Sequence, residues 1–161
     1  MMKIKKKELV LGTAQLGSRY GLNNSNVSKK QSFKILEYAW KNGIKTYDTA
    51  VSYNSQKILG EFIKTNGIYR EIKIYTKISS LKSENVIGIK KRLEKNIKEL
   101  NTKPEITFLH DERDLNKLKK NIGDLTKESL TNNFGVSIYN YKNIYNYFNY
   151  KNFFYQFLYN L

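Results

Sequence analysis

Apolar residues recur along this chain with two alternating spacings. Short apolar or β-branched runs predict strands, and apolar residues three and four positions apart predict amphipathic helices. The predicted strands cover residues 9–12, 44–47, 72–76, 105–109, 134–137 and 153–157. The predicted helices cover residues 30–41, about 55–65, 86–100, 114–128 and 141–148. Each of the first five strands is therefore followed by a helix.

Local signals mark where several of these helices begin and end. Ser55 is a suitable N-cap for the second helix, since its side chain can accept a hydrogen bond from the first turn. Asn42-Gly43 and Asn66-Gly67 end the first two helices, because glycine tolerates the left-handed conformation of a C-terminal cap. Strict alternation of strands and helices predicts parallel strands joined by crossover helices, which is an α/β fold.

Two parallel architectures agree with this alternation. A doubly wound open sheet usually carries a glycine-rich phosphate loop after its first strand. Residues 12–17 read Gly-Thr-Ala-Gln-Leu-Gly, which has neither the dinucleotide-binding spacing nor a Walker pattern. A barrel remains, and a full one needs about 250 residues. We therefore expect one domain over residues 1–161 that forms a partial TIM-type (β/α) barrel of about six parallel strands and stops short of closure.

Composition bears more on the cellular location of the protein than on its function. The absence of cysteine excludes a disulfide framework and fits a cytoplasmic location. Neither a membrane span nor a signal peptide is predicted, because no apolar run is long enough. The net charge of +15 raises nucleic-acid binding as an alternative. We regard nucleic acid as an improbable partner, because the lysines are scattered outside the first seven residues and the charge bears on solubility rather than on fold.

Polar residues stand at or just after the ends of three successive predicted strands. Asp48 follows the second strand, Lys77 the third and His110, the only histidine, the fourth, while Tyr53 lies in the loop after Asp48. In a parallel barrel all strand C-termini open at one face, where active sites lie. Strand alternation places Lys77 opposite to the neighbouring isoleucines, so Lys77 points inward if those isoleucines pack on the helices.

These four residue types together suit proton transfer to a carbonyl group. A tyrosine hydroxyl is a weak acid with a pKa of about 10, and a nearby ammonium favours its phenolate. A carboxylate beside the lysine keeps the ammonium charged and oriented. A neutral histidine can donate a hydrogen bond to the carbonyl oxygen, while a cofactor supplies the hydride.

The chain resembles the aldo-keto reductases in several segments that follow one another in the family's order. Residues 47–53, Tyr-Asp-Thr-Ala-Val-Ser-Tyr, and residues 55–60, Ser-Gln-Lys-Ile-Leu-Gly, are similar to the family's signature segment. Residues 11–17 resemble its first strand and loop, and Thr76-Lys77 and Leu109-His110 match its lysine and histidine segments. Residues 135–137 and 155–161 resemble its fifth and sixth strands.

This resemblance implies a fold, a cofactor and a set of roles. Aldo-keto reductases are barrels that reduce small-molecule aldehydes and ketones with NADPH or NADH and without a metal. By resemblance Tyr53 is the general acid, Lys77 lowers its pKa, Asp48 pairs with Lys77, and His110 orients the carbonyl. The residues that the resemblance assigns to the nicotinamide are Gly12, Thr13, Ser137 and Gln156.

The chain departs from the family pattern at three places. Ile138 replaces the asparagine that many relatives place after the serine, which removes one nicotinamide contact. Gln56 replaces a glutamate, and we expect this change to affect only the end of the second helix. The 161 residues have no counterpart of the seventh and eighth strands, whose loops hold the cofactor phosphates in the family. We therefore expect a truncated or split reductase with weak or no activity alone, or alternatively an inactive remnant that binds a partner or self-associates through open barrel edges.

Overall fold

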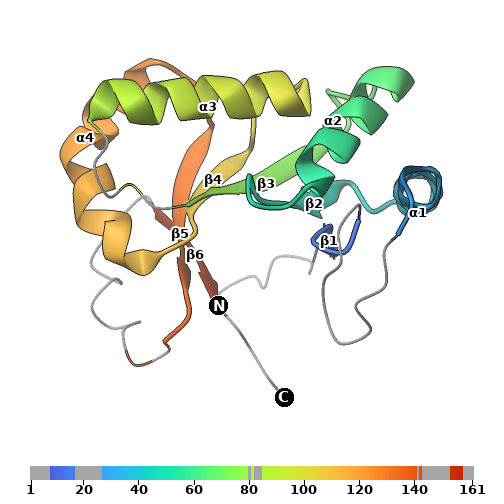
Figure 1. Ribbon diagram of the computed structural model, residues 1–161, viewed down its shortest axis with the longest axis horizontal. Helices are drawn as coiled ribbons and strands as arrows, with labels where there is room; N and C mark the ends of the chain where they lie inside the picture. Colours follow the sequence, from blue (N-terminus) through green and yellow to red (C-terminus); the bar gives the residue numbers. More distant parts are fainter. Residues whose placement is uncertain are drawn as a thin grey trace, which may run out of the picture.

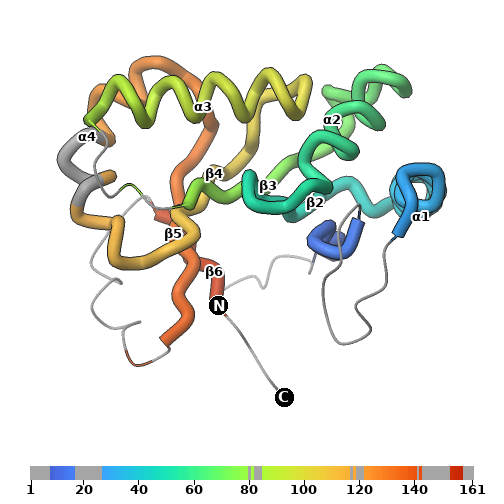
Figure 2. The backbone as a smooth tube through the Cα atoms, in the orientation of Figure 1, coloured from blue at the N-terminus to red at the C-terminus, as the bar shows by residue number. Residues whose placement is uncertain are grey.

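The computed structural model describes residues 8–16, 27–79, 81, 85–140, 142 and 153–157. The described residues form a six-stranded parallel sheet whose strand order, β1-β2-β3-β4-β5-β6, follows the chain (Figures 1 and 2). The strands are β1 (Val10–Gly12), β2 (Thr46–Asp48), β3 (Lys73–Ile78), β4 (Ile106–Leu109), β5 (Asn133–Ile138) and β6 (Phe153–Phe157). This confirms the predicted partial barrel.

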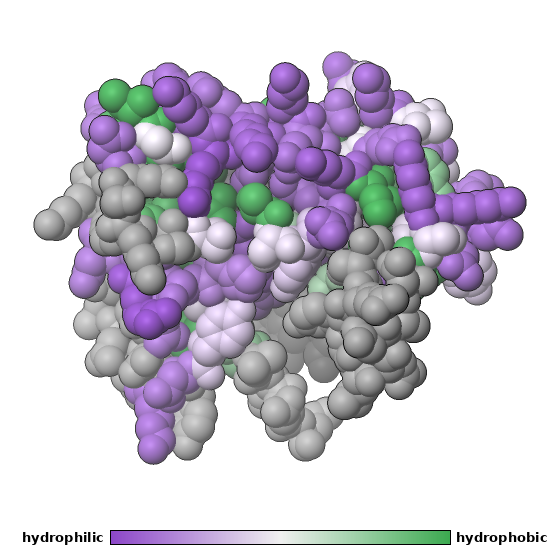
Figure 3. Space-filling view, in the orientation of Figure 1, coloured by the Kyte–Doolittle hydropathy of each residue, from purple (hydrophilic) through white to green (hydrophobic). Residues whose placement is uncertain are grey.

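Helices alternate with these strands and lie on one side of the curved sheet (Figure 1). They are α1 (Lys29–Lys41), α2 (Ser55–Asn66), α3 (Val86–Leu100) and α4 (Leu115–Lys127), with a short 3-10 helix, η1 (Glu112–Asp114), before α4. The side of the molecule seen in Figure 3 is mostly hydrophilic over these helices, with only scattered hydrophobic residues. The helix predicted at 141–148 lies outside the described residues.

Apolar residues of the sheet and helices make two buried clusters. Isoleucines of β3 contribute to both: Ile74 packs with Leu36 and Phe62, and Ile78 packs with Leu93 and Phe134. Each of these isoleucines is only 1% exposed. Because Ile74 and Ile78 face the helices, the alternate residues Tyr75 and Lys77 face the inner side of the sheet, as the sequence pattern predicts.

The second strand begins two residues later than predicted. The N–H of Ile44 donates to the carbonyl of Ala39 at 3.0 Å, so it completes the end of α1 rather than joining the sheet. Gly43 allows this turn with a φ of 86°. The strand therefore starts at Thr46 and ends on Asp48, which pairs with Gly12 of β1 and Tyr75 of β3.

The start of α2 differs from the prediction for both of its first two residues. Asn54, not Ser55, occupies the N-cap position. The effect of Gln56 extends beyond the end of the helix. Its side chain is 1% exposed, donates to Glu99 of α3 at 2.8 Å and accepts from Thr76 of β3 at 2.7 Å. A buried amide needs such partners, and Gln56 therefore joins three elements.

Helices α2 and α3 cross at very close range. A Cβ atom added to Gly60 would lie 1.8 Å from the backbone oxygen of Glu99, so only glycine fits at this crossing. The side chain of Asn101, just after α3, donates to the carbonyl of Gly60 at 3.1 Å. Within the residues that the structure describes, no helix has the length and apolar character to cross a membrane.

Candidate active site

The ends of β2 and β3 bring Asp48 and Lys77 into a buried ion pair. The Nζ of Lys77 donates to Oδ1 of Asp48 and, at 3.3 Å, to the backbone oxygen of Thr49. The two side chains are only 5% and 15% exposed. A buried ammonium is stable only with such partners, so this pair keeps the charge of Lys77 at a defined position.

The fifth and sixth strands add two polar side chains to the other oxygen of Asp48. Gln156 of β6 donates from Nε2 to Oδ2 of Asp48 at 3.0 Å. The hydroxyl of Ser137 on β5 donates to Oε1 of Gln156 at 3.2 Å. Ser137 and Gln156 are paired in the register of β5 and β6. A continuous polar chain therefore runs from Ser137 through Gln156 and Asp48 to Lys77.

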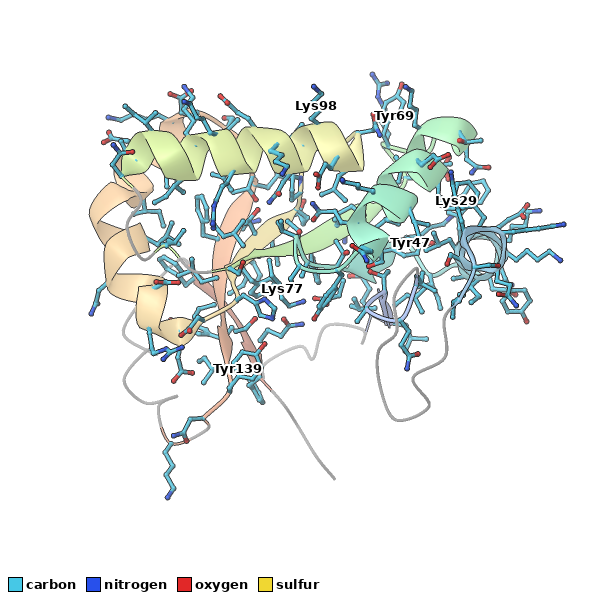
Figure 4. All side chains as sticks on the ribbon, in the orientation of Figure 1. Lys29, Tyr47, Tyr69, Lys77, Lys98 and Tyr139 are labelled. Atoms are coloured by element: carbon cyan, nitrogen blue, oxygen red, sulfur yellow. The ribbon has the colours of Figure 1, made fainter. Side chains whose placement is uncertain are left out.

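Aromatic rings surround His110 at the same end of the sheet. The ring of Tyr53 meets the imidazole edge-on, with centroids 6.2 Å apart and an interplanar angle of 89°. The ring of Tyr139 also contacts the imidazole, with centroids 6.2 Å apart and an interplanar angle of 35°. The Nζ of Lys77 is 5.8 Å from the Tyr53 ring centroid. Lys77 and Tyr139, labelled in Figure 4, lie on the side of the sheet away from α3.

The electrostatic setting favours a neutral imidazole at His110. Burial lowers the pKa of His110 below its ordinary value, and the positive charge of Lys77 lowers it further. Asp48 and Asp111 oppose this pKa shift without reversing it. A neutral imidazole carries one N–H donor, as hydrogen bonding to a carbonyl oxygen requires.

A pocket of about 240 Å³ joins most of these residues. Its lining residues come from four segments of the chain: Asp48, Tyr53, Lys77, Ser137, Ile138, Tyr139, Gln156 and Phe157. His110 contacts Tyr53 and Tyr139. It lines another pocket of about 330 Å³, which shares Tyr139 with the first, together with Asp111 and Arg113. Ile138 contributes an apolar wall to the first of these pockets.

Gly12 and Thr13 are not among the residues that line this pocket. Thr13 is 1% exposed, and its N–H and hydroxyl both donate to the backbone oxygen of Asp48, at 2.9 and 3.0 Å. Its hydroxyl also lies 3.2 Å from the hydroxyl of Ser55. The described contacts of Thr13 thus hold the end of β2 in place.

The pocket also includes an aromatic residue that the sequence argument did not select. Tyr139 contacts His110 and lines both pockets. A signal was present, because Tyr139 stands two positions after Ser137 and strand alternation puts both on one face.

Comparisons with known proteins agree with this fold. Among solved structures, an aldo-keto reductase from Klebsiella pneumoniae in complex with NADPH matches with a TM-score of 0.66 and 18% identity, over 83% of this chain and 46% of that one. The aldo-keto reductase of the silkworm Bombyx mori matches with a TM-score of 0.68 and 19% identity, over 89% and 48%. The aldose reductase of Giardia lamblia matches with a TM-score of 0.67 and 17% identity, over 89% of this chain and 53% of that one.

The chain thus has the fold of a partial (β/α) barrel and spans about half the length of these solved structures. The sequence model of the aldo/keto reductase family matches residues 8–161. The chain therefore belongs to the aldo/keto reductase family. No curated protein sequence matches it.

Proposed function

We propose that this chain reduces an aldehyde or ketone with NADPH or NADH, and that Tyr53 is its general acid. The observation that carries the proposal is the buried Asp48–Lys77 pair, whose ammonium lies 5.8 Å from the centroid of the Tyr53 ring. Such an arrangement stabilises the phenolate that forms when tyrosine releases its proton. Family membership supports the same reaction class.

Each residue has a distinct task in this proposal. Tyr53 delivers its proton to the carbonyl oxygen as negative charge develops there. Lys77 stabilises the resulting phenolate, and Asp48 keeps Lys77 charged and oriented. His110, neutral because of its lowered pKa, donates a hydrogen bond that positions the carbonyl.

Ser137 and Gln156 fit the nicotinamide group of the cofactor. Both line the pocket beside Lys77, and together they offer a hydroxyl and a primary amide, which complement the donors and acceptors of a carboxamide. The bound cofactor would supply the hydride. The Klebsiella pneumoniae structure was solved in complex with NADPH, which supports this cofactor class.

Oxidation of NADPH with a simple reactive aldehyde tests the proposal. We expect the turnover of the purified chain to be weak and to fall by about 10²- to 10⁴-fold in Tyr53→Phe. Tyr69→Phe is the matched control, because Tyr69 is 51% exposed and lies far from the pocket (Figure 4). Absence of both NADPH binding and turnover in the folded chain would contradict the proposed activity.

The open edges of the sheet favour a second candidate function, in which the chain works as an oligomerising module. Among the described strands, β1 and β6 each pair with a single neighbour. Between these two edges, the inner face has an apolar groove of about 450 Å³ lined in part by Val10, Phe154 and Phe157. These three side chains are 43%, 48% and 51% exposed. Unpaired strand edges with apolar side chains promote pairing between chains.

Sedimentation at several protein concentrations tests self-association. A dimer or larger oligomer that dissociates in Val10→Lys would support pairing through the β1 edge. Ile87→Lys on α3 is the control, because Ile87 is 59% exposed but lies away from both edges. A monomer at all concentrations would contradict this second function.

A further inference from the structure

The carboxylate of Asp48 receives hydrogen bonds from two different strands. Lys77 of β3 donates to its Oδ1, and Gln156 of β6 donates to its Oδ2 at 3.0 Å. A carboxylate is planar, so donors at both oxygens fix its rotation as well as its position. Gln156 therefore takes part in orienting the carboxylate that pairs with Lys77.

The bond between Gln156 and Asp48 joins strands that are not neighbours. Three strands, β3, β4 and β5, separate β2 from β6 in the sheet order, so the bond crosses the inner side of the curved sheet (Figure 1). Strand β2 has only three residues and ends on Asp48. The orientation of this side chain therefore depends on β6 as well as on its neighbour β3.

The amide of Gln156 is oriented in turn by Ser137 of β5. The Ser137 hydroxyl donates to Oε1 of Gln156 at 3.2 Å, and the two residues are partners in the register of β5 and β6. With Oε1 facing Ser137, Nε2 faces Asp48. Because Nε2 carries two hydrogens, one can stay on Asp48 while the other is offered to a ligand in the pocket. A role at Asp48 is therefore compatible with contact to a nicotinamide.

The orientation of Asp48 matters because this residue holds Lys77 near Tyr53. The Nζ of Lys77 lies 5.8 Å from the centroid of the Tyr53 ring and also donates to the backbone oxygen of Thr49 at 3.3 Å. The side chain of Lys77 is only 5% exposed, so solvent screens its charge weakly. A rotation of the carboxylate would move the ammonium relative to Tyr53, and the bond to Thr49 would limit the movement.

We propose that Gln156 is a positioning residue for proton transfer and acts through Asp48. By fixing the carboxylate, it keeps the Lys77 ammonium where the charge stabilises a Tyr53 phenolate. This inference rests on the proposed role of Tyr53 as the general acid. It gives Gln156 a second task beside contact with the nicotinamide, so an edge strand takes part in the proton transfer.

NMR of the full chain labelled with ¹³Cζ-tyrosine tests this role without cofactor or turnover. The Tyr53 signal is the one that disappears in Tyr53→Phe, and its pH titration reports the acidity of the hydroxyl. We expect Tyr53 to titrate at higher pH in Gln156→Leu, because the displaced ammonium stabilises the phenolate less well. Phe154→Leu, on the same edge strand, should leave the titration unchanged. An unchanged Tyr53 titration in folded Gln156→Leu would overturn the proposal.

A double-mutant cycle separates action through Asp48 from a direct effect on Tyr53. In an Asp48→Asn background, Gln156→Leu should shift the Tyr53 titration no further, since the carboxylate that it orients is gone. Equal shifts in both backgrounds would contradict action through Asp48. Ser137→Ala leaves the buried ion pair intact and removes the bond that orients the Gln156 amide. It should shift the Tyr53 titration in the same direction as Gln156→Leu, and a shift in the opposite direction would count against the proposal.

Turnover distinguishes this inference from the proposed reductase activity. At saturating NADPH we expect kcat to fall about tenfold in Gln156→Leu, the value of one hydrogen bond to a charged group, in addition to weaker NADPH binding. Weaker NADPH binding with an unchanged kcat would mean that Gln156 acts only on the cofactor, and the proposal would be wrong. If the Tyr53 titration shifts as expected but the chain neither binds nor oxidises NADPH, the reductase function fails while the positioning of Lys77 by Gln156 stands.

Discussion

Strands β3 and β6 each place one polar side chain, Lys77 and Gln156, in the same pocket, but they hold opposite positions in the sheet. Strand β3 has a partner strand on both sides and is buried over most of its length. Strand β6 pairs only with β5 among the described strands, and Phe154 and Phe157 are about half exposed. The interior of the sheet therefore holds the Asp48–Lys77 half of the candidate site, whereas Gln156 lies on an edge strand.

This difference predicts that stability and cofactor binding respond separately to substitution. Changes at β2 and β3 should disturb the fold and the chemistry together. Changes at β6 should affect ligand binding with little cost in stability, because local opening of an edge strand exposes few buried contacts.

The largest effect is expected for Lys77→Met. This change leaves the carboxylate of Asp48 buried without its cation, which should lower the free energy of unfolding by about 3–5 kcal/mol. Urea denaturation measures the loss. The double variant Lys77→Met with Asp48→Asn should be more stable than Lys77→Met alone, because no buried charge then remains. A single-variant loss below about 1 kcal/mol would contradict the view that the pair is buried and tightly coupled.

A matched pair of apolar truncations compares the two strands directly. Ile74→Ala on β3 removes a side chain that is 1% exposed and should cost about 2–5 kcal/mol of unfolding free energy. Phe154→Ala on β6 removes a larger side chain that is 48% exposed, and we expect a smaller cost despite its size. Equal losses in thermal or urea unfolding would show that β6 is as deeply packed as β3.

The same amide-to-leucine change at two positions sharpens the comparison. Gln56→Leu leaves Thr76 and Glu99 without their partner in the interior and should cost about 1–3 kcal/mol. Gln156→Leu removes the bonds to Asp48 and Ser137 at the edge, and should cost about 1 kcal/mol or less. Only Gln156→Leu should weaken NADPH binding, measured by fluorescence titration. The reverse pattern would place the nicotinamide away from β6.

The sequence predicts the positions of the helices and most strands well, because these depend on local spacing and on caps. The helix predicted over 86–100 matches α3, and Gly67 ends α2 with a left-handed φ of 66°, as its position after Asn66 predicts. The alternation along β3 also predicts which face carries Lys77. These features need no knowledge of residues distant in the chain.

Contacts between distant residues are the part that the sequence does not predict. Gln156 meets Asp48 across 108 positions, and no local pattern indicates that Gln156 would bond to Asp48. Gln56 looks like a helix-end residue until α3 brings Glu99 beside it.

The smallest of the predicted effects is a change in the protonation of His110. This residue follows β4, between the strands that carry Asp48 and Lys77 and those that carry Ser137 and Gln156. Its pKa is lowered mainly by burial, so it should titrate below the ordinary value of 6.5, and Tyr139→Ala should raise the pKa by letting water reach the ring. NMR can follow this directly, because the chain has one histidine.

The sign of the linked stability change follows from this pKa. The unfolded chain binds a proton more readily than the folded one, so the stabilisation from neutral His110 is complete above pH 6.5. It falls as the pH drops from 6.5 toward the folded-state pKa. Tyr139→Ala should narrow the pH range between the folded-state pKa of His110 and 6.5. Phe154→Ala should leave this range unchanged, because Phe154 lies on the β6 edge and makes no imidazole contact among the described residues. A His110 pKa at or above 6.5 in the unmodified chain would mean that water reaches the imidazole past the β6 edge. Burial would then protect Asp48 and Lys77 but not His110.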